Sequence, residues 1–286
     1  MDARLAVAAR LTGTPARQVR AFSGTVAEVD LTDGRAVIVK HAGTPQAARA
    51  EAAGLRWLAA ADALPIPVVH GDDGAWLVTE RVPPGEPSAS GAVALGRGLA
   101  ALHASGAPAY GAPPPGGPVE AYIGPAPMRN VPSASGADWA AWYAEQRVLP
   151  YLRTAVDRGV MSVAEGAVVE RACARLPGIA GPAEPAARLH GDLWNGNVLW
   201  GADGRAWLID PAAHGGHRET DLAMLRLFGC PFLERVVSGY EEVAPLAEGW
   251  RERVGAHQLF PLLVHVVLFG EGYVGRAVEA ARSVTV

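Results

Sequence analysis

The residues whose types and spacing best fit a chemical reaction lie in one segment near position 200. Residues 190–197 read HGDLWNGN, in which Asn197 follows Asp192 by five residues, and Asp210 comes thirteen residues after Asn197. Transfer of a phosphoryl group from ATP to a hydroxyl needs a carboxylate that orients the acceptor and takes its proton, oxygen ligands for Mg²⁺, and a lysine for the inner phosphates. Asp192, Asn197 and Asp210 supply the first two needs, because hard oxygen ligands are what Mg²⁺ selects.

A lysine and a glutamate upstream fit the third need. Lys40 ends the apolar run AVIVK, and Glu51 falls on the apolar face of a helix predicted over 46–61. A lysine at the end of a strand is by itself usually solvated, but a carboxylate on an apolar face is costly unless a cation pairs with it. We therefore predict an ion pair between Lys40 and Glu51 that aims the ammonium group at the α- and β-phosphates of ATP.

The chain before position 83 is predicted to be rich in β-strands after a short helix. Residues 25–31 and 36–40 have the composition of strands and are joined by the turn sequence TDGR at 32–35. A further strand is predicted within 75–82. It runs into the sequence PPG at 83–85, which stops the strand and marks a natural boundary between lobes.

The rest of the chain is predicted to be mostly helical, with one short β insert that carries the motif. Helical periodicity occurs at 91–105, 139–157, 163–176 and from 220 onward, and short strands are predicted at 188–190, 197–200 and 206–210. Residues 106–137 are dense in Pro and Gly and are predicted to be structureless. Long segments of this kind inside a compact domain are unusual and are often functional or mobile. We predict an α+β, two-lobed fold with an ATP-binding lobe over 1–82 and a catalytic and substrate-binding lobe over 83–286.

The spacing of Asp192 and Asn197, with Asp210 downstream, resembles the catalytic loop and metal-binding aspartate of protein kinases. Gly191 stands where protein kinases have arginine, and Pro211 follows Asp210 in place of a Phe-Gly pair. This pattern is similar to the aminoglycoside and choline kinase branch of the protein-kinase-like fold.

Two other segments take their expected roles from this kinase-like arrangement. Ser23, Gly24 and Thr25 lie in a turn at the place of the loop that covers the ATP phosphates, although this turn has a single glycine. Glu80 and Val82 lie where the linker between the lobes would offer backbone groups to adenine. These five residues complete the predicted ATP site.

Across nearly its whole length the sequence resembles the fructosamine kinase (ketosamine-3-kinase) family. A tryptophan two residues after the catalytic aspartate, here Trp194, is favoured in that family. Other matching stretches follow in the same order, at 96–103, 122–124, 139–150, 210–212, 216–219, 221–224 and 227–229, and then at 258–259, 265, 269–270 and 273.

This resemblance implies ATP-dependent phosphorylation of O3 of a ketosamine, such as a ribulosamine or fructosamine, whose product then decomposes and frees the amine. The expected outcome is deglycation. By the same resemblance Asp192 is the base, Asn197 and Asp210 bind Mg²⁺, and Lys40 with Glu51 positions ATP.

The acceptor site is less well defined by the sequence. Trp194 is a candidate wall of the sugar site and is equally compatible with core packing. The sequence departs from the family at 119–121, at 214–215, and at Val264 and Val267, all outside the catalytic loop. A kinase for another small alcohol, aminoglycoside-like or choline-like, is therefore the second hypothesis. An ATP-binding pseudokinase scaffold is the third.

The polar residues that follow the β insert are predicted to support the catalytic loop. Arg218 and Glu219 are expected to brace it through charge pairs, and Asp221 to lie at a helix start or just behind the site. His103 is expected to form hydrogen bonds within the helical lobe.

Composition limits the partners and the compartment. The 286 residues are 50% hydrophobic with a formal net charge of −4, which favours a globular fold and gives no general attraction to nucleic acid. The two cysteines fit a reducing compartment, and the apolar run 259–270 is too short to span a bilayer. We predict a cytoplasmic monomer or weak homodimer that acts on a small-molecule or protein-bound ketosamine, without a nucleic-acid or membrane partner.

Overall fold

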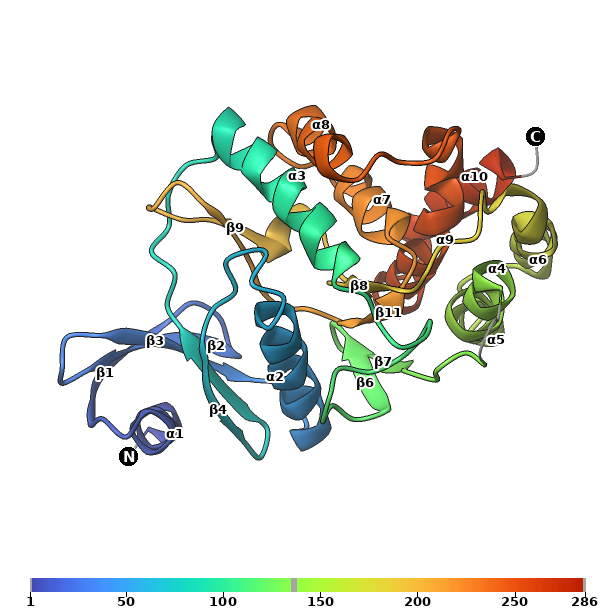
Figure 1. Cartoon of the computed structure of the whole chain (residues 1–286). Helices are drawn as coiled ribbons and strands as arrows, with labels where there is room; N and C mark the ends of the chain where they lie inside the picture. Colours follow the sequence, from blue (N-terminus) through green and yellow to red (C-terminus); the bar gives the residue numbers. More distant parts are fainter. Residues whose placement is uncertain (1, 135–137, 285–286) are drawn as a thin grey trace.

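In the computed structural model, which describes residues 2–134 and 138–284, an antiparallel five-stranded sheet lies beside a larger, mostly helical part (Figure 1). The strand order in this sheet is β1-β2-β3-β5-β4. The elements of the sheet part are α1 (Ala3–Thr12), β1 (Ala16–Ala21), β2 (Val26–Leu31), β3 (Ala36–His41), α2 (Pro45–Ala59), β4 (Val69–Asp73) and β5 (Trp76–Glu80).

The alternation of side chains along the strands gives this sheet two different faces. Val39 of β3 packs in one apolar cluster with Val7 of α1, whereas Leu77 of β5 packs in another cluster with the buried face of α2. Lys40 follows Val39 and is the cross-strand partner of Leu77. Since consecutive residues of a strand point to opposite faces and paired residues share one, Lys40 faces α2, the helix that carries Glu51.

Among its described residues, the helical part contains three two-stranded sheets between the helices. Its elements are α3 (Ala89–Ala104), β6 (Glu120–Ile123), β7 (Ala126–Arg129), α4 (Trp139–Tyr143), a π-helical turn (Ala144–Val148), α5 (Leu149–Asp157), α6 (Val163–Ile179), β8 (Ala187–Leu189), a 3₁₀ turn (Asn195–Asn197), β9 (Val198–Trp200), β10 (Ala206–Leu208), β11 (His214–Gly216), α7 (Glu219–Leu227), α8 (Leu233–Val243), α9 (Trp250–Phe269), a 3₁₀ turn (Glu271–Tyr273) and α10 (Val274–Ser283).

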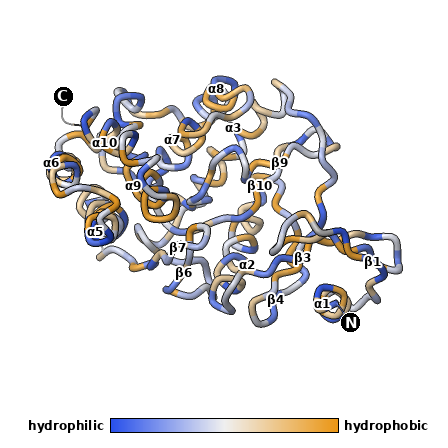
Figure 2. The backbone as a smooth tube through the Cα atoms, turned by 180° about the vertical axis from the view of Figure 1, so that it is seen from behind, coloured by the Kyte–Doolittle hydropathy of each residue, from blue (hydrophilic) through white to orange (hydrophobic). Residues whose placement is uncertain are grey.

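Two large apolar clusters hold this part together. One surrounds α9, whose Leu259 and Leu263 are fully buried, and Figure 2 shows this helix as largely hydrophobic. The other joins Leu55 of α2 to Leu99 of α3 and Leu222 of α7, so it connects the two parts of the molecule. Within the described residues, every helix is too short or too polar to cross a bilayer.

The predicted α+β organisation is confirmed, and the strands predicted at 25–31, 36–40 and 75–82 correspond to β2, β3 and β5. The prediction that 106–137 is structureless was wrong for part of this segment, because β6 and β7 form a hairpin there. Residues 135–137 lie outside the described residues. Strands of four residues between Pro and Gly are too short to show a period-two pattern.

The helix predicted over 139–157 is interrupted by the π-helical turn. Pro150 has no N–H group, so it cannot donate to the carbonyl of Gln146 four residues earlier. The Arg147 guanidinium donates to that oxygen instead, at 3.3 Å. Helical periodicity in the sequence does not reveal this insertion.

Candidate active site

The side chains of Lys40, Glu51 and Asp210 meet at the junction of the sheet and the helical part. The Lys40 Nζ atom lies 2.8 Å from Oε2 of Glu51 and 3.0 Å from Oδ2 of Asp210. Burial alone would lower the pKa of Lys40, but the negative charges of the two carboxylates raise it above its ordinary value. The ammonium group is therefore cationic across the physiological pH range, and the predicted ion pair is present.

Asp192 and Asn197 lie in the loop that follows β8, and they contact each other. The side-chain Nδ2 of Asn197 donates to Oδ2 of Asp192 at 3.0 Å and to its backbone oxygen at 2.8 Å. The backbone oxygen of Asn197 accepts from the Ile209 N–H at 3.1 Å, which brings this loop beside Asp210. With its nitrogen committed to Asp192, Asn197 has its amide oxygen left as a possible cation ligand.

The turn before Asp192 requires a glycine. Gly191 has φ 82°, and a Cβ atom there would lie 2.2 Å from the backbone oxygen of Ala212. No side chain fits in that space, and a positive φ is costly for residues other than glycine. This explains why an arginine at this position, usual in protein kinases, cannot occur in this chain.

A buried aspartate holds this turn from behind. Asp221 accepts hydrogen bonds from the backbone N–H groups of His190 at 2.8 Å and Gly191 at 3.0 Å, and its Oδ2 lies 3.2 Å from Nε2 of His103. The predictions that Asp221 lies just behind the site and that His103 forms hydrogen bonds in the helical lobe are confirmed. Asp221, which itself contacts His103, thus fixes the backbone that leads into Asp192.

His190 is a neutral support of the same loop. Its Nε2 lies 2.9 Å from the Ile209 carbonyl oxygen, and its Nδ1 lies 3.3 Å from the Asp192 backbone nitrogen. Because Nδ1 accepts from that N–H, the ring proton sits on Nε2 and is donated to Ile209. Burial lowers the pKa of His190, which keeps the ring neutral.

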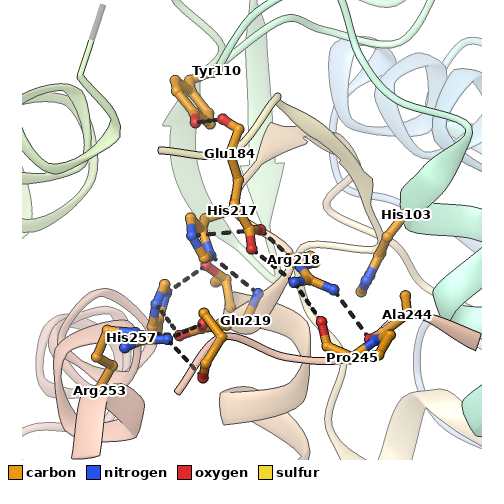
Figure 3. Close-up of polar contacts among 12 residues, drawn as sticks. His103, Tyr110, Glu184, His217, Arg218, Glu219, Ala244, Pro245, Arg253 and His257 are labelled. Carbon is orange, nitrogen blue, oxygen red and sulfur yellow. Dashed lines mark hydrogen bonds and ion pairs between the residues drawn. The ribbon is translucent and has the colours of Figure 1, made fainter. Parts of the chain in front are cut away.

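The prediction that Arg218 and Glu219 brace the catalytic loop was wrong. Arg218 forms a bidentate ion pair with Glu184, and Arg253 forms one with Glu219, in a separate buried network (Figure 3). His217 and His257 lie close enough to Glu219 to resemble a metal site. Both oxygens of the Glu219 carboxylate already accept from Arg253, so this cluster is explained as an ion-pair network.

Burial has a strong effect on the predicted base. It raises the pKa of Asp192 to about 7, the charges of Asp210 and Asp221 act in the same direction, and the hydrogen bond from Asn197 opposes them. A carboxyl group whose pKa lies near neutrality is suited to accept a proton from a hydroxyl.

Two cavities meet at the Lys40–Glu51–Asp210 group. The apolar cavity, of about 480 Å³, is lined by Val26, Ile38 and Leu77 and by residues 79–82. The other cavity, of about 500 Å³, is lined by several alanine and proline residues and by Asp192 and Asn197, and we call it the polar cavity because it contains these two polar side chains. Lys40, Glu51 and Asp210 line both cavities.

Asp210 is held at this junction by an unusual backbone conformation. Its φ is 52°, in the left-handed region that a short polar side chain tolerates better than others. The side chain is 45% exposed, so its carboxylate is accessible from the cavities while one oxygen contacts Lys40. Strain of this kind concentrates at functional sites.

The structure places the other predicted ATP-site residues around the same two cavities, with two exceptions. Glu80 and Val82 line the apolar cavity and Thr25 lines the polar one. Ser23 and Gly24 line neither cavity. The Ser23 hydroxyl accepts from the backbone N–H groups of Thr25 and Val26, so it shapes the turn between β1 and β2.

Trp194 lies on the wall of the polar cavity and is 38% exposed. Its indole ring covers Gly196, where a Cβ atom would be 2.2 Å from the ring, and it packs edge-on against Phe228. Of the two alternatives that the sequence left open, these contacts favour a cavity wall over core packing.

The Pro- and Gly-rich segment also contributes to the polar cavity. Pro114, Pro118, Tyr122 and Pro125 line this cavity together with Asp192 and Asn197. Sequence reasoning assigned none of these residues to the site, although Tyr122 lies in the stretch 122–124 that resembles the family. A further signal was the unusual length of a Pro-rich connection inside a compact protein.

Comparison with known proteins agrees with this geometry. Residues 24–285 match the model of a family described as fructosamine kinase. The chain belongs to the fructosamine kinase family. It is accordingly a phosphotransferase, and the sequence-based assignment to this family is confirmed.

Two relatives of this fructosamine kinase family member show that the similarity extends over most of the chain. A “Probable ketoamine kinase” of Thermus thermophilus is 38% identical over 240 residues, which cover 82% of each chain. The crystal structure of a “putative fructosamine-3-kinase” from Thermobifida fusca has 46% sequence identity and a TM-score of 0.92, covering 100% of this chain and 99% of that one.

An aminoglycoside phosphotransferase solved with ADP and hygromycin B shares the fold. Its TM-score is 0.63 at 16% identity, with 98% of each chain covered. At this level of identity the similarity concerns the fold alone, and it confirms the predicted kinase-like architecture.

Proposed function

We propose that this protein transfers the γ-phosphoryl group of ATP to a sugar hydroxyl, O3, of a ketosamine such as a ribulosamine or fructosamine. The observation that carries this proposal is the meeting of two cavities at one charged group. The apolar cavity is the proposed site of the nucleoside, Asp192 lines the polar cavity, and Lys40 lines both. Phosphoryl transfer depends mainly on this kind of positioning.

ATP is the donor used by kinases of this type, and the apolar cavity is its proposed binding site. Adenine packs between the sheet and Leu199 and Ile209, and the backbone at 80–82 offers its hydrogen-bonding groups. Lys40, held by Glu51, contacts the α- and β-phosphates. Of the turn at 23–25, Thr25 is the residue that lines the polar cavity and lies beside the proposed phosphate site. On this proposal, the ATP-binding lobe is 1–82 and the catalytic lobe is 83–286.

Asp192 is the proposed base. As the new P–O bond forms between the acceptor oxygen and the γ-phosphorus, the bond from that phosphorus to the β–γ bridging oxygen breaks. The hydroxyl proton passes to the Asp192 carboxylate and ADP leaves. The hydrogen bonds from Asn197 hold the carboxylate in place while this happens.

Asn197 and Asp210 are the proposed ligands of Mg²⁺. The amide oxygen of Asn197 and the partly exposed carboxylate of Asp210 are hard oxygen donors beside the predicted phosphate site, so the donor set fits this ion. When bound, Mg²⁺ would neutralise part of the negative charge of the ATP phosphates.

The acceptor sugar is proposed to lie in the polar cavity against Trp194. The described carboxylates that line this cavity are Glu51, Asp192 and Asp210, and all three already serve the catalytic group. A polycationic acceptor such as an aminoglycoside would need additional acids, so this lining favours a ketosamine. The phosphorylated product would then decompose and free the amine, which amounts to deglycation.

An acceptor panel tests this proposal. ATP consumption with Mg²⁺ would be measured against ribulose-lysine, fructose-lysine, an aminoglycoside and choline, with Asp192→Asn as the blank. Turnover confined to the ketosamines is expected. Turnover of choline or the aminoglycoside alone would support the second hypothesis, a kinase for another small alcohol. ATP binding without turnover of any acceptor would support the scaffold hypothesis.

A further inference from the structure

Asn130 is a buried amide in the wall of the polar cavity, and half of its hydrogen-bonding capacity is unused. It lines this cavity together with Asp192 and Trp194, and it is 0% exposed. Its Oδ1 accepts from Nη2 of Arg147 at 2.9 Å. Among the described residues, no group accepts a hydrogen bond from its Nδ2. A buried amide nitrogen without a partner is costly, so its presence beside the proposed base calls for a functional reason.

The orientation of this amide is fixed by the fold. Arg147 can only donate hydrogen bonds, so the amide oxygen must face the guanidinium, and Nδ2 takes the other branch of the planar amide. The backbone is held as well, because the N–H of Asn130, directly after β7, donates to the Val119 carbonyl oxygen at 2.7 Å. Nδ2 is therefore a donor with a defined place in the cavity wall.

Arg147 is an unusual partner, because it is a buried cation without a carboxylate. It is 1% exposed and lies in the π-helical turn, where its guanidinium sits 4.8 Å from the ring centroid of Trp142. It donates to Asn130 and to the carbonyl oxygens of Arg129 and Gln146, and no described carboxylate forms an ion pair with it. Burial lowers the pKa of Arg147 to about 10, so it stays cationic at neutral pH.

An aspartate at position 130 would suit Arg147 better than the asparagine does. It would have the same shape and accept the same hydrogen bond from Nη2. It would also neutralise the buried cation and leave no donor unpartnered. What the asparagine alone provides is an N–H donor in the cavity wall. A local rule broken in this way is typical of functional positions.

We propose that Asn130 binds the acceptor sugar, with Nδ2 donating to an oxygen next to the hydroxyl that is phosphorylated. This inference rests on the proposed function, because it needs the sugar in the polar cavity. Arg147 is a positioning residue that holds the amide oxygen from behind. As a cation it also polarises the amide, which makes the N–H groups stronger donors.

Such a donor selects a class of acceptor. A ketosamine carries oxygens on both carbons that flank C3, so one of them can accept from Nδ2 while O3 lies at Asp192. Choline has no oxygen besides its reacting hydroxyl, and its binding would leave Nδ2 without a partner. A site built to hydrogen-bond a substrate group discriminates strongly against compounds that lack it. Asn130 therefore favours polyhydroxy acceptors over simple alcohols.

The substitution Asn130→Asp separates sugar binding from structural support. The aspartate keeps the hydrogen bond from Arg147, so the melting temperature should equal or exceed that of the wild type. It cannot donate, and it faces the sugar oxygen with a negative charge. We therefore expect kcat/KM for ribulose-lysine to fall about 30-fold or more, with the KM for ATP unchanged.

Gln146→Glu is the matched control. It also exchanges an amide for a carboxylate, and it does so at the residue before Arg147, but Gln146 lines neither cavity. It should leave kcat/KM for ribulose-lysine and the KM for ATP unchanged.

A second measurement observes the amide in the wild type. The chain has three asparagines, Asn130, Asn195 and Asn197, so ¹⁵N labelling of asparagine side chains gives three NH₂ groups. The loss of signals in Asn195→Ala and Asn197→Ala identifies those of Asn130 by elimination. Ribulose-lysine added without ATP should move the Asn130 signals downfield as the hydrogen bond forms, whereas choline should leave them in place.

These measurements distinguish a failure of the inference from a failure of the proposed function. An unchanged kcat/KM for ribulose-lysine in Asn130→Asp would overturn the inference alone, and so would stationary Asn130 signals at saturating ribulose-lysine. The spectra decide this however stable the variant is. A wild-type enzyme that phosphorylates no ketosamine would overturn the proposed function, and this inference with it.

Discussion

The side-chain amide of Asn197 donates to the carboxylate of Asp192 at 3.0 Å, and to the backbone oxygen of the same residue at 2.8 Å. One residue therefore orients the proposed base and offers its remaining oxygen to the proposed cation site. The pKa of Asp192 therefore depends on which side chain stands at position 197.

Asn197→Asp keeps an oxygen ligand but replaces the hydrogen-bond donor with a second carboxylate. A like charge at this distance disfavours the ionised form of Asp192 and raises its pKa. The midpoint of the kcat/KM profile against pH should therefore move upward by about one unit or more. Asn197→Ala, which adds no charge, serves as the control and should lower kcat with a smaller displacement of the midpoint. An Asn197→Asp profile that overlays the wild-type profile would contradict this coupling.

The wild-type enzyme should lose activity on acidification at an unusually high pH for a carboxylate. Because Asp192 must be ionised to accept a proton and burial raises its pKa to about 7, activity is present above that pH and is lost below it. We expect kcat/KM to fall about tenfold per pH unit on the acidic side. Steady-state rates between pH 5.5 and 8.5 test this, with the melting temperature followed in parallel. Constant activity down to pH 5.5 would show that Asp192 is not the titrating base.

Lys40→Met should impair the use of ATP far more than the stability of the sheet. The variant removes the cation that both Glu51 and Asp210 contact, and kcat/KM for ATP should fall about 100-fold or more. Arg35→Met is a suitable control, since Arg35 is an exposed cation at the turn before β3 of the same sheet. Unchanged catalytic efficiency in Lys40→Met would argue against the role of Lys40.

Asp221→Asn should destabilise the protein. The Asp221 carboxylate accepts from two backbone N–H groups, and an amide nitrogen there would face one of these donors. We expect the free energy of unfolding to fall by about 3 kcal/mol, measured by urea denaturation. Asp203→Asn, in the exposed turn before β10, should change it little. A wild-type stability for Asp221→Asn would contradict the supporting role of this residue.

The stabilisation by Asp221 also has a defined pH dependence. Burial alone would raise the pKa of Asp221, but the hydrogen bonds from His103 and from the backbone hold it below its ordinary value. A carboxyl group whose pKa is lowered by folding stabilises the native state above its unfolded pKa of about 4. This contribution is lost as the pH falls from there through the folded pKa.

The contacts of Lys40 with Glu51 and of Asp192 with Asn197 agree with the sequence-based predictions. The helical period placed Glu51 on the apolar face of α2, and the resemblance of β3 to the lysine strand of kinases paired it with Lys40. Asp192 and Asn197 are five residues apart in one loop, so a single turn brings them together.

What the sequence could not predict depends on contacts between distant elements. The β6–β7 hairpin consists of four-residue strands whose Pro and Gly neighbours hide any periodicity. The pairing of Arg218 with Glu184 and of Arg253 with Glu219 joins residues 34 positions apart in each case. Charge patterns identify possible partners, but only the packing of α7 against α9 and its neighbours decides between them.

The proposed reaction is phosphorylation of O3 of a ketosamine. The most direct test is to incubate the enzyme with MgATP and ribulose-lysine and to locate the phosphate in the product by ³¹P–¹H correlation NMR. We expect the phosphorus to couple to the proton on C3, and we expect Asp192→Asn to yield no such product. Phosphate on another oxygen, or an unmodified ribulose-lysine beside an active wild-type enzyme, would contradict it.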